Sequence, residues 1–129
     1  MSHKSYSLTG NVAKLNLRRS SPAEQDVSIR VAAQIALLGR VPPRLRAFSI
    51  DSAHRLLSCR FVFDGEPSFA DTDTTSAVVA EIVSHHWESL RGLNEEHLAV
   101  PMPGKIDHLR LVIFERCEES WTNWTPSGR

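Results

Sequence analysis

The sequence has few glycines, only two cysteines and no long apolar run, and each shortage excludes a class of protein. Six of the 129 residues are glycine, and none of them form a cluster that could wrap a phosphate, so neither a P-loop nor a dinucleotide-binding fingerprint is present. No stretch approaches the roughly 18 apolar residues that span a bilayer, and residues 1–20 lack the apolar core of a secretory signal. We therefore expect a cytoplasmic protein with no membrane partner.

The two cysteines and the balanced charge narrow the possibilities further. Cys59 and Cys117 are too few for a disulfide framework, and both lie in apparent strands, which predicts buried free thiols. Fifteen basic residues balance fifteen acidic ones, whereas a dedicated nucleic-acid binder usually has a basic excess. Phe61 and Phe63 fall on the predicted core face, where they cannot stack on bases. The sequence thus predicts no nucleic-acid partner.

Hydrophobic periodicity predicts a first helix over residues 22–38. Ser21 and Glu24 have the spacing of a capping box, and Pro22 suits the first helical position. Gly39 follows as a plausible stop, and a proline pair beyond it forbids continuation. The apolar residues that recur at helical spacing are Val27, Val31, Ile35 and Leu38.

The next segments predict a hairpin, a second helix and one or two further strands. Residues 45–51 and 56–64 are joined by the short link 52–55, which favours an antiparallel pair. The second of these strands alternates strictly, with Cys59, Phe61 and Phe63 on one face. Asp71 or Asp73 would cap the second helix, which would end near Gly92. A short strand over 96–100 and a clearer one over 109–115 would complete the sheet.

This order of elements predicts an α+β fold. The expected architecture is a small, mainly antiparallel sheet of three or four strands, with two helices packed on one face. A parallel crossover from strand 56–64 through the second helix to a strand over 108–116 stays open as an alternative. We expect a loosely ordered tail over 1–20, one domain over 21–118, and a tryptophan-containing extension over 119–129.

The residues capable of chemistry do not combine into a catalytic or metal site. Glu81 precedes His85 by one helical turn, but two ligands fall short of the usual three or four, so a solvated Glu81–His85 pair with His86 beside the core is the expectation. There is no nucleophile elbow, and neither cysteine lies at a helix N-terminus, where a thiol becomes reactive. The sequence therefore predicts no enzyme, no metal and no cofactor.

Two surface features remain as candidates for partner binding. Four carboxylates without an intervening basic residue follow the phenylalanine-rich strand, at Asp64, Glu66, Asp71 and Asp73. They fit turn and cap chemistry, and also a surface that attracts a basic protein. Trp121 and Trp124 lie in a polar C-terminal segment, where they could dock on the protein itself or on a partner.

The segments 36–50, 57–67, 79–82 and 112–116 together resemble a group of small bacterial proteins. The strongest part is the strand that ends in Phe63-Asp64-Gly65-Glu66. Some members are similar to immunity proteins of contact-dependent growth inhibition and related polymorphic toxin systems, and the resemblance covers about residues 30–118. It implies a protein that binds a cognate toxin in the cytoplasm and blocks it without catalytic residues.

The resemblance and the surface features together define the expected partner-binding residues. The alternative is a non-catalytic homodimeric regulatory or scaffold protein that associates through a sheet edge or the tryptophan segment. The predicted contacts to the toxin are Asp64, Glu66, Asp71, Asp73, Glu81, His85, Trp121 and Trp124.

Overall fold

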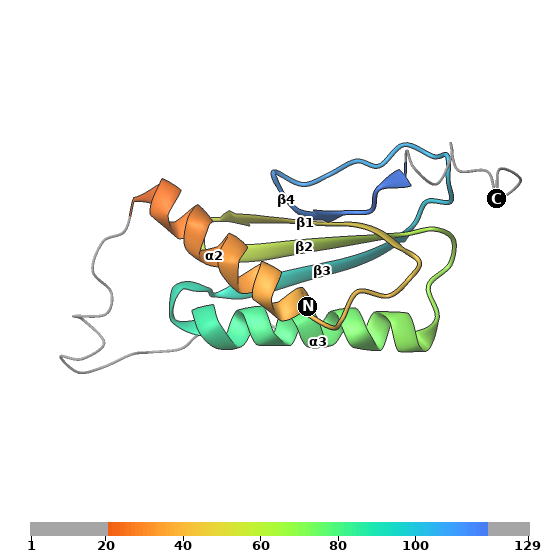
Figure 1. Cartoon of the computed structure of the whole chain (residues 1–129). Coiled ribbons are helices and arrows are strands. Elements are labelled where there is room, and N and C mark those ends of the chain that lie inside the picture. Colours follow the sequence, from red (N-terminus) through yellow and green to blue (C-terminus); the bar gives the residue numbers. More distant parts are fainter. Residues whose placement is uncertain (1–20, 119–129) are drawn as a thin grey trace, which may run out of the picture.

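A computed structural model describes residues 21–118 and shows two α-helices on one face of a four-stranded sheet (Figure 1). The strands lie in the order β3-β2-β1-β4. The α+β prediction and the order of elements are confirmed. The elements are α2 (Pro22–Leu37), β1 (Leu45–Ala53), β2 (Leu56–Phe63), α3 (Phe69–His86), a 3₁₀ turn (Trp87–Ser89), β3 (Gly92–Ala99) and β4 (Leu111–Glu115).

Strands β1 and β2 form the predicted antiparallel hairpin. Ala53 pairs with Leu56, which leaves a two-residue turn of His54 and Arg55. Both turn residues have positive φ, at 54° and 64°, the geometry of a type I′ turn that matches the twist of the flanking strands. The Arg55 guanidinium donates to the carbonyls of Glu88 and Ser89, so the turn is fastened to the chain entering β3.

The outer strands join the hairpin in opposite senses. Strand β4 pairs antiparallel with β1, whereas β3 runs parallel to β2. A parallel connection needs a crossover of a dozen or more residues, and α3 supplies it. The crossover left open from the sequence therefore exists, but it ends on Gly92–Ala99 rather than on the last strand.

Both helices begin at capping boxes, one predicted and one missed. Ser21 Oγ accepts the Glu24 N–H, and the Glu24 carboxylate accepts the Ser21 N–H. Ser68 and Asp71 make the same two hydrogen bonds, so α3 begins at Phe69. The prediction that Asp71 or Asp73 is the N-cap is wrong, because Asp71 is the third helical residue. The helix also ends at His86, and Gly92 begins β3 instead of ending a helix.

The core lies between the sheet and the two helices. The rings of Phe48 and Phe61 stack with their centroids 4.2 Å apart, and Phe63 and Ile82 are fully buried beside them. Cys59 belongs to this core, and burial raises the pKa of its thiol. Cys117, in contrast, follows β4 and is exposed, so the expectation of two buried strand cysteines holds only for Cys59.

The opposite face of the sheet is covered by the connection from β3 to β4, residues 100–110. Arg46 donates to the carbonyl of Val100, and Ser49 Oγ accepts the Leu109 N–H. Arg60 reaches the Asp107 carbonyl from the neighbouring strand. Strand β1 is therefore buried over residues 45–50, although its second face is polar.

Helix α2 forms as predicted, but the regularly spaced apolar residues are not the ones it buries. The side chains in the core are Ile29, Ala33, Ala36 and Leu37. The exposed ones are Val27, Val31, Ile35 and Leu38. The helix is thus apolar on both sides. Neither helix within residues 21–118 combines the length and apolar composition needed to cross a membrane.

Candidate partner-binding surface

The acidic stretch that follows β2 is divided between two places in the fold. Asp64 turns toward the polar face of the sheet, whereas Glu66, Asp71 and Asp73 lie at the start of α3. Gly65 makes the turn between them, with φ at 93°, a value that favours glycine. A Cβ at this position would lie 2.6 Å from Arg44 Nη2, and the flexible end of the Arg44 side chain could move away from it, so the positive φ is the reason for glycine here.

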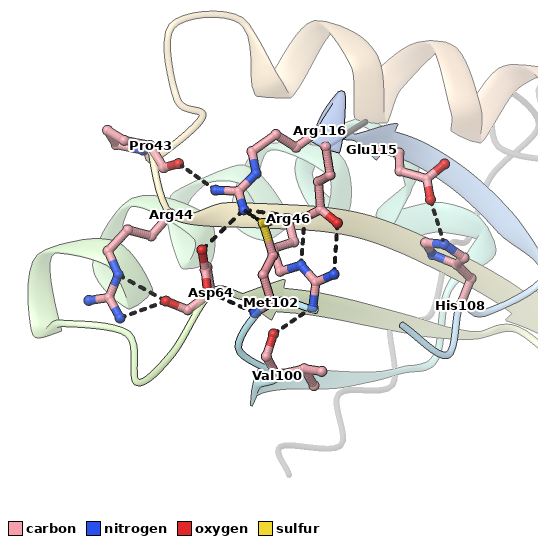
Figure 2. Close-up of polar contacts among 10 residues, drawn as sticks. Pro43, Arg44, Arg46, Asp64, Val100, Met102, His108, Glu115 and Arg116 are labelled. Atoms are coloured by element: carbon pink, nitrogen blue, oxygen red, sulfur yellow. Dashed lines mark hydrogen bonds and ion pairs between the residues drawn. The ribbon is translucent and has the colours of Figure 1, made fainter. Parts of the chain in front are cut away.

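Asp64 belongs to a polar network at one end of the sheet (Figure 2). Its carboxylate accepts the Met102 N–H at 3.0 Å and Arg116 Nη2 at 3.1 Å. These two hydrogen bonds, the backbone one first, lower the pKa of the Asp64 carboxyl. Arg44 donates to the Asp64 carbonyl. The Asp64 side chain therefore joins β2 to the 100–110 connection and to the chain after β4.

The same network holds the buried Arg46. Its guanidinium makes two hydrogen bonds to the Glu118 carboxylate, and this pairing lowers the pKa of Glu118. Arg116 Nη2 lies 3.3 Å from Glu118 Oε2 and so joins the two acidic residues. Sequence spacing gave no sign of these contacts, because Arg46 and Glu118 are 72 residues apart.

At the start of α3, an aromatic side chain lies among the remaining carboxylates. Phe69 is 85% exposed, the largest value among the exposed large hydrophobic residues of the described chain. We call Glu66, Phe69, Asp71 and Asp73 the Phe69 surface. The Asp71 carboxylate accepts the Ser68 N–H in the capping box of α3, while Glu66 and Asp73 are exposed. Phe69 was not identified from the sequence, since one phenylalanine in a polar segment has no periodicity.

The other predicted contacts lie farther along α3 or outside the described residues. The Glu81 carboxylate accepts from Arg40 in the α2–β1 connection, whereas we expected it to pair with His85. His85 is exposed. At 1.5 Å per residue, Glu81 and His85 lie about 12 and 18 Å along the helix from Asp73. Trp121 and Trp124 lie outside the described residues.

One polar cluster that the sequence did not indicate lies between α3 and β3. His97 Nε2 lies 2.9 Å from Thr75 Oγ1 and 3.2 Å from Glu95 Oε2, and Ser76 donates to Glu95. A catalytic triad places hydroxyl and carboxylate on opposite imidazole nitrogens, but here both lie at the same nitrogen. His97 also stacks on Phe61. These contacts join α3 to β3 and do not form a nucleophile relay.

Metal binding finds no support in the described part of the chain. Between residues 21 and 118, no group of three or more histidine, cysteine, aspartate or glutamate side chains could hold an ion.

His86 lies near the end of α3 and is half-buried. Burial, followed by the charge of the nearby His85, lowers the pKa of its imidazole. The features that stand out are therefore surfaces, one acidic and aromatic at the start of α3, the other apolar on α2.

Comparison with known proteins identifies the family of the chain. This α+β domain falls in a class of small immunity proteins. The chain belongs to the MafI2 immunity protein family, whose model matches residues 26–118. The match begins within α2 and extends beyond β4, and it includes the Phe69 surface and the polar network. Among curated proteins, none matches the chain. The resemblance to polymorphic-toxin immunity proteins that the sequence suggested is confirmed.

Proposed function

We propose that this protein binds a cognate toxin in the cytoplasm of the cell that makes both, and blocks it. The observation that carries the proposal is the immunity-family match, which spans nearly the whole described domain. An immunity protein of this kind works by occupying a surface of its partner, so it needs no catalytic group of its own. Contact-dependent growth inhibition is the type of system in which we place it.

The Phe69 surface supports this proposal best among the described residues. Aromatic side chains are enriched at the centres of protein interfaces, and Phe69 is already exposed. Glu66 and Asp73 flank it with negative charge, which would speed the approach of a basic toxin. The expected complement is a basic toxin surface with an apolar pocket for the phenyl ring.

The remaining predicted contacts take different places in this proposal. Glu81 and His85 would extend the contact along α3, and Trp121 and Trp124 would add to it from the C-terminal segment. Asp64 would contribute indirectly, because its bonds to Met102 and Arg116 hold the turn that presents Glu66. We therefore assign direct contact to Glu66, Phe69 and Asp73 first.

The first test is rescue of growth when the protein is co-expressed with the toxin encoded beside its gene. The double variant Glu66→Lys/Asp73→Lys should slow association at low salt by about tenfold to a hundredfold, and high salt should reduce the difference. Asp71 is left unchanged because its reversal would also remove the cap of α3. Biolayer interferometry across a salt series gives the rates.

A matched control is Asp107→Lys, which reverses an exposed carboxylate on the connection that covers the opposite face of the sheet. It should leave the association rate unchanged. Phe69→Ala should instead raise the dissociation rate, since it removes apolar contact and no charge. Full protection and unchanged rates in all these variants would remove the Phe69 surface from the proposal. Failure of the parent protein to protect would reject the toxin-binding function itself.

A second candidate function is the homodimeric scaffold or regulator considered from the sequence. The observation that favours self-association is the exposed apolar side of α2. Dimerisation and toxin binding would use different surfaces, so they can be tested separately.

A further inference from the structure

The sheet ends in two edge strands, β3 and β4, which differ in how well they are protected. An edge strand presents unpaired backbone N–H and C=O groups to which another chain can bind, and proteins blunt such edges with short strands and bulges. Strand β4 has both protections, because it has five residues and its register with β1 shifts between Phe48 and Ser49. Strand β3 has neither, since its eight residues pair with β2 in one unbroken register. Within residues 21–118, no strand lies beyond β3.

The backbone groups that β3 leaves open follow from one hydrogen bond. The Val100 N–H, directly after the strand, donates to the Phe63 carbonyl at the end of β2. In a regular ladder the N–H groups of successive residues point to opposite sides of the strand, so the even-numbered residues of β3 face β2 as Val100 does. The N–H and C=O groups that point away from the sheet belong to Leu93, Glu95, His97 and Ala99. No residue of β3 is buried, which agrees with an open edge.

Helix α3 runs alongside β3 in the opposite direction (Figure 1). Thr75 contacts His97, and the next helical residue, Ser76, donates to Glu95, which precedes His97 in the strand. The first turns of α3 therefore lie beside the end of β3. Phe69 begins this helix, and it lies about 10 Å along the axis from Ser76. The Phe69 surface thus adjoins the end of the open edge.

We propose that a strand of the toxin adds to the open edge of β3, extends the sheet and places Lys or Arg side chains beside the glutamates of that edge. This inference rests on the proposed toxin-binding function and names how the toxin is held. In such a complex, backbone hydrogen bonds supply affinity, and side chains at alternate positions supply specificity. The Phe69 ring would contact the toxin where the added strand passes the start of α3.

Charge favours a basic toxin strand as the occupant. Strand β3 contains Glu95 and Glu96 and no lysine or arginine, and Asp73 of the Phe69 surface adds a third carboxylate. Glu95 accepts from Ser76 on the helix side, and Glu96 pairs with Arg60 on the other side, so both carboxylates flank the edge without lying across it. Because these carboxylates outnumber the one guanidinium, the open backbone groups lie in negative surroundings, which attract a basic segment.

The basic groups near β3 do not reverse this charge, and they leave a second copy as a poorer occupant. His97 lies 3.2 Å from Glu95, and Arg60 lies 3.0 Å from Glu96, so each is directed at a glutamate of its own chain. Arg91 precedes the strand, at the end away from the Phe69 surface. Two copies joined at the middle of this edge would bring their glutamates together, and like charges on neighbouring strands are destabilising.

The first experiment measures amide hydrogen exchange of the full chain, alone and in complex with the toxin encoded beside its gene. In the free chain, the outward-pointing amides of β3 should exchange quickly, because no partner holds them. In the complex, their exchange should slow by at least about tenfold. The amides of β4, residues 111–115, are the control and should exchange at the same rate in both samples. Contact through the Phe69 side chain alone would not slow the β3 amides.

The second experiment removes one of these donors. Ala99 is exposed, and its N–H points away from β2, a position at which an edge strand tolerates proline. Ala99→Pro should therefore fold with the melting temperature of the parent but bind the toxin at least about tenfold more weakly, because it loses a donor and obstructs the added strand. Ala99→Val keeps the N–H and should bind like the parent.

The third experiment tests the charge of the added strand. Asn94 is exposed in the middle of the acidic stretch of β3. At low salt, Asn94→Lys should slow association with the toxin by about threefold, and Asn94→Asp should speed it by a similar factor, with smaller changes at high salt. Both variants lose the same amide, so the opposite signs isolate the charge.

Each opposite outcome overturns the inference. Unchanged exchange of the β3 amides in a complex that forms does so, as does equal binding of Ala99→Pro and Ala99→Val, or faster association of Asn94→Lys. Slow exchange in the free chain would show that the chain itself, or a second copy, already covers the edge, and sedimentation would tell these two apart. A parent that protects cells while its β3 amides are unaffected rejects this mode of binding and leaves the proposed function standing. A parent that neither binds the toxin nor protects rejects both.

Discussion

The two faces of the sheet are both covered, but by different kinds of interaction. On the helix side, Phe48, Phe61 and Phe63 are fully buried among apolar neighbours. On the other side, Arg46 and Ser49 are almost as deeply buried, yet each is held by a hydrogen bond to the 100–110 connection. One face is stabilised by apolar area, which is non-directional. The other depends on directional pairs, which fail when one partner is lost.

This difference also explains where the molecule offers surfaces to a partner. The phenylalanines of β2 are buried in the core. Phe69, which follows this strand in the chain, is exposed instead. In the same way, Asp64 is engaged in hydrogen bonds on the polar face, whereas Glu66 and Asp73 stay exposed. The residues available to a partner are therefore those that neither face of the sheet has buried or paired. Because the two faces are stabilised differently, substitutions on them should change the free energy of unfolding by different amounts.

The largest effect is expected on the apolar face. Phe61→Ala would remove a ring that stacks on Phe48 at 4.2 Å and on His97 at 5.3 Å, and would leave a cavity in the centre of the core. We expect a loss of about 3–5 kcal/mol in the free energy of unfolding, measured by urea denaturation. Phe61→Leu fills most of this space and should lose clearly less. Equal losses would show that cavity size does not set the stability of this face.

A smaller effect is expected on the polar face. Glu118→Gln would leave the Arg46 guanidinium without its carboxylate, although the Arg46 side chain is only 4% exposed. Breaking a fully buried pair costs about 3–5 kcal/mol. Because Glu118 is itself 21% exposed, we expect about 2 kcal/mol by urea denaturation. The control Glu115→Gln changes a carboxylate that is 58% exposed and should change stability by less than about 0.5 kcal/mol. Similar values for the two variants would contradict the proposed role of the Arg46 pair.

The smallest effect that we expect from the polar face is a dependence of stability on acid pH. Hydrogen bonds from Met102 and Arg116 lower the pKa of Asp64, and the pairing with Arg46 lowers that of Glu118. The unfolded chain then binds more protons than the folded chain below about pH 4–5, so stability falls as pH decreases through this range. Asp64→Asn should give a shallower decline in the urea midpoint from about pH 5 to pH 2 than the parent does. A variant as steep as the parent would exclude Asp64 as a source of the dependence.

The parts of the fold that the sequence revealed are those defined by neighbouring residues. The Ser21–Glu24 cap and the alternation in β2 both have short, regular spacing, and both were predicted. The Ser68–Asp71 cap has the same spacing, but the prediction placed the N-cap at Asp71 or Asp73 instead of at Ser68. Strand β3 gave little signal, because Asn94, Glu95 and Glu96 interrupt its apolar pattern, and its pairing with β2 decides its conformation.

The candidate surfaces show the same division. The acidic stretch after β2 was evident from the sequence, whereas its separation into Asp64 and the Phe69 surface was not. Arg116, which draws Asp64 inward, is 52 residues away. Likewise, periodicity placed Val27, Val31 and Ile35 on one side of a helix, but it could not decide which side faces the sheet. Ile29, Ala33, Ala36 and Leu37 on the other side face the core instead.

The sequence by itself determined the class of fold, the caps, the phenylalanine-rich core strand and the likeness to immunity proteins, because each depends on residue type and local spacing. Only the tertiary structure decided which apolar side of α2 is open, which carboxylates stay exposed and how the second face of the sheet is closed. Those outcomes depend on contacts between residues far apart in the chain. Several partners compete for each side chain, and the packing of the whole domain selects one of them.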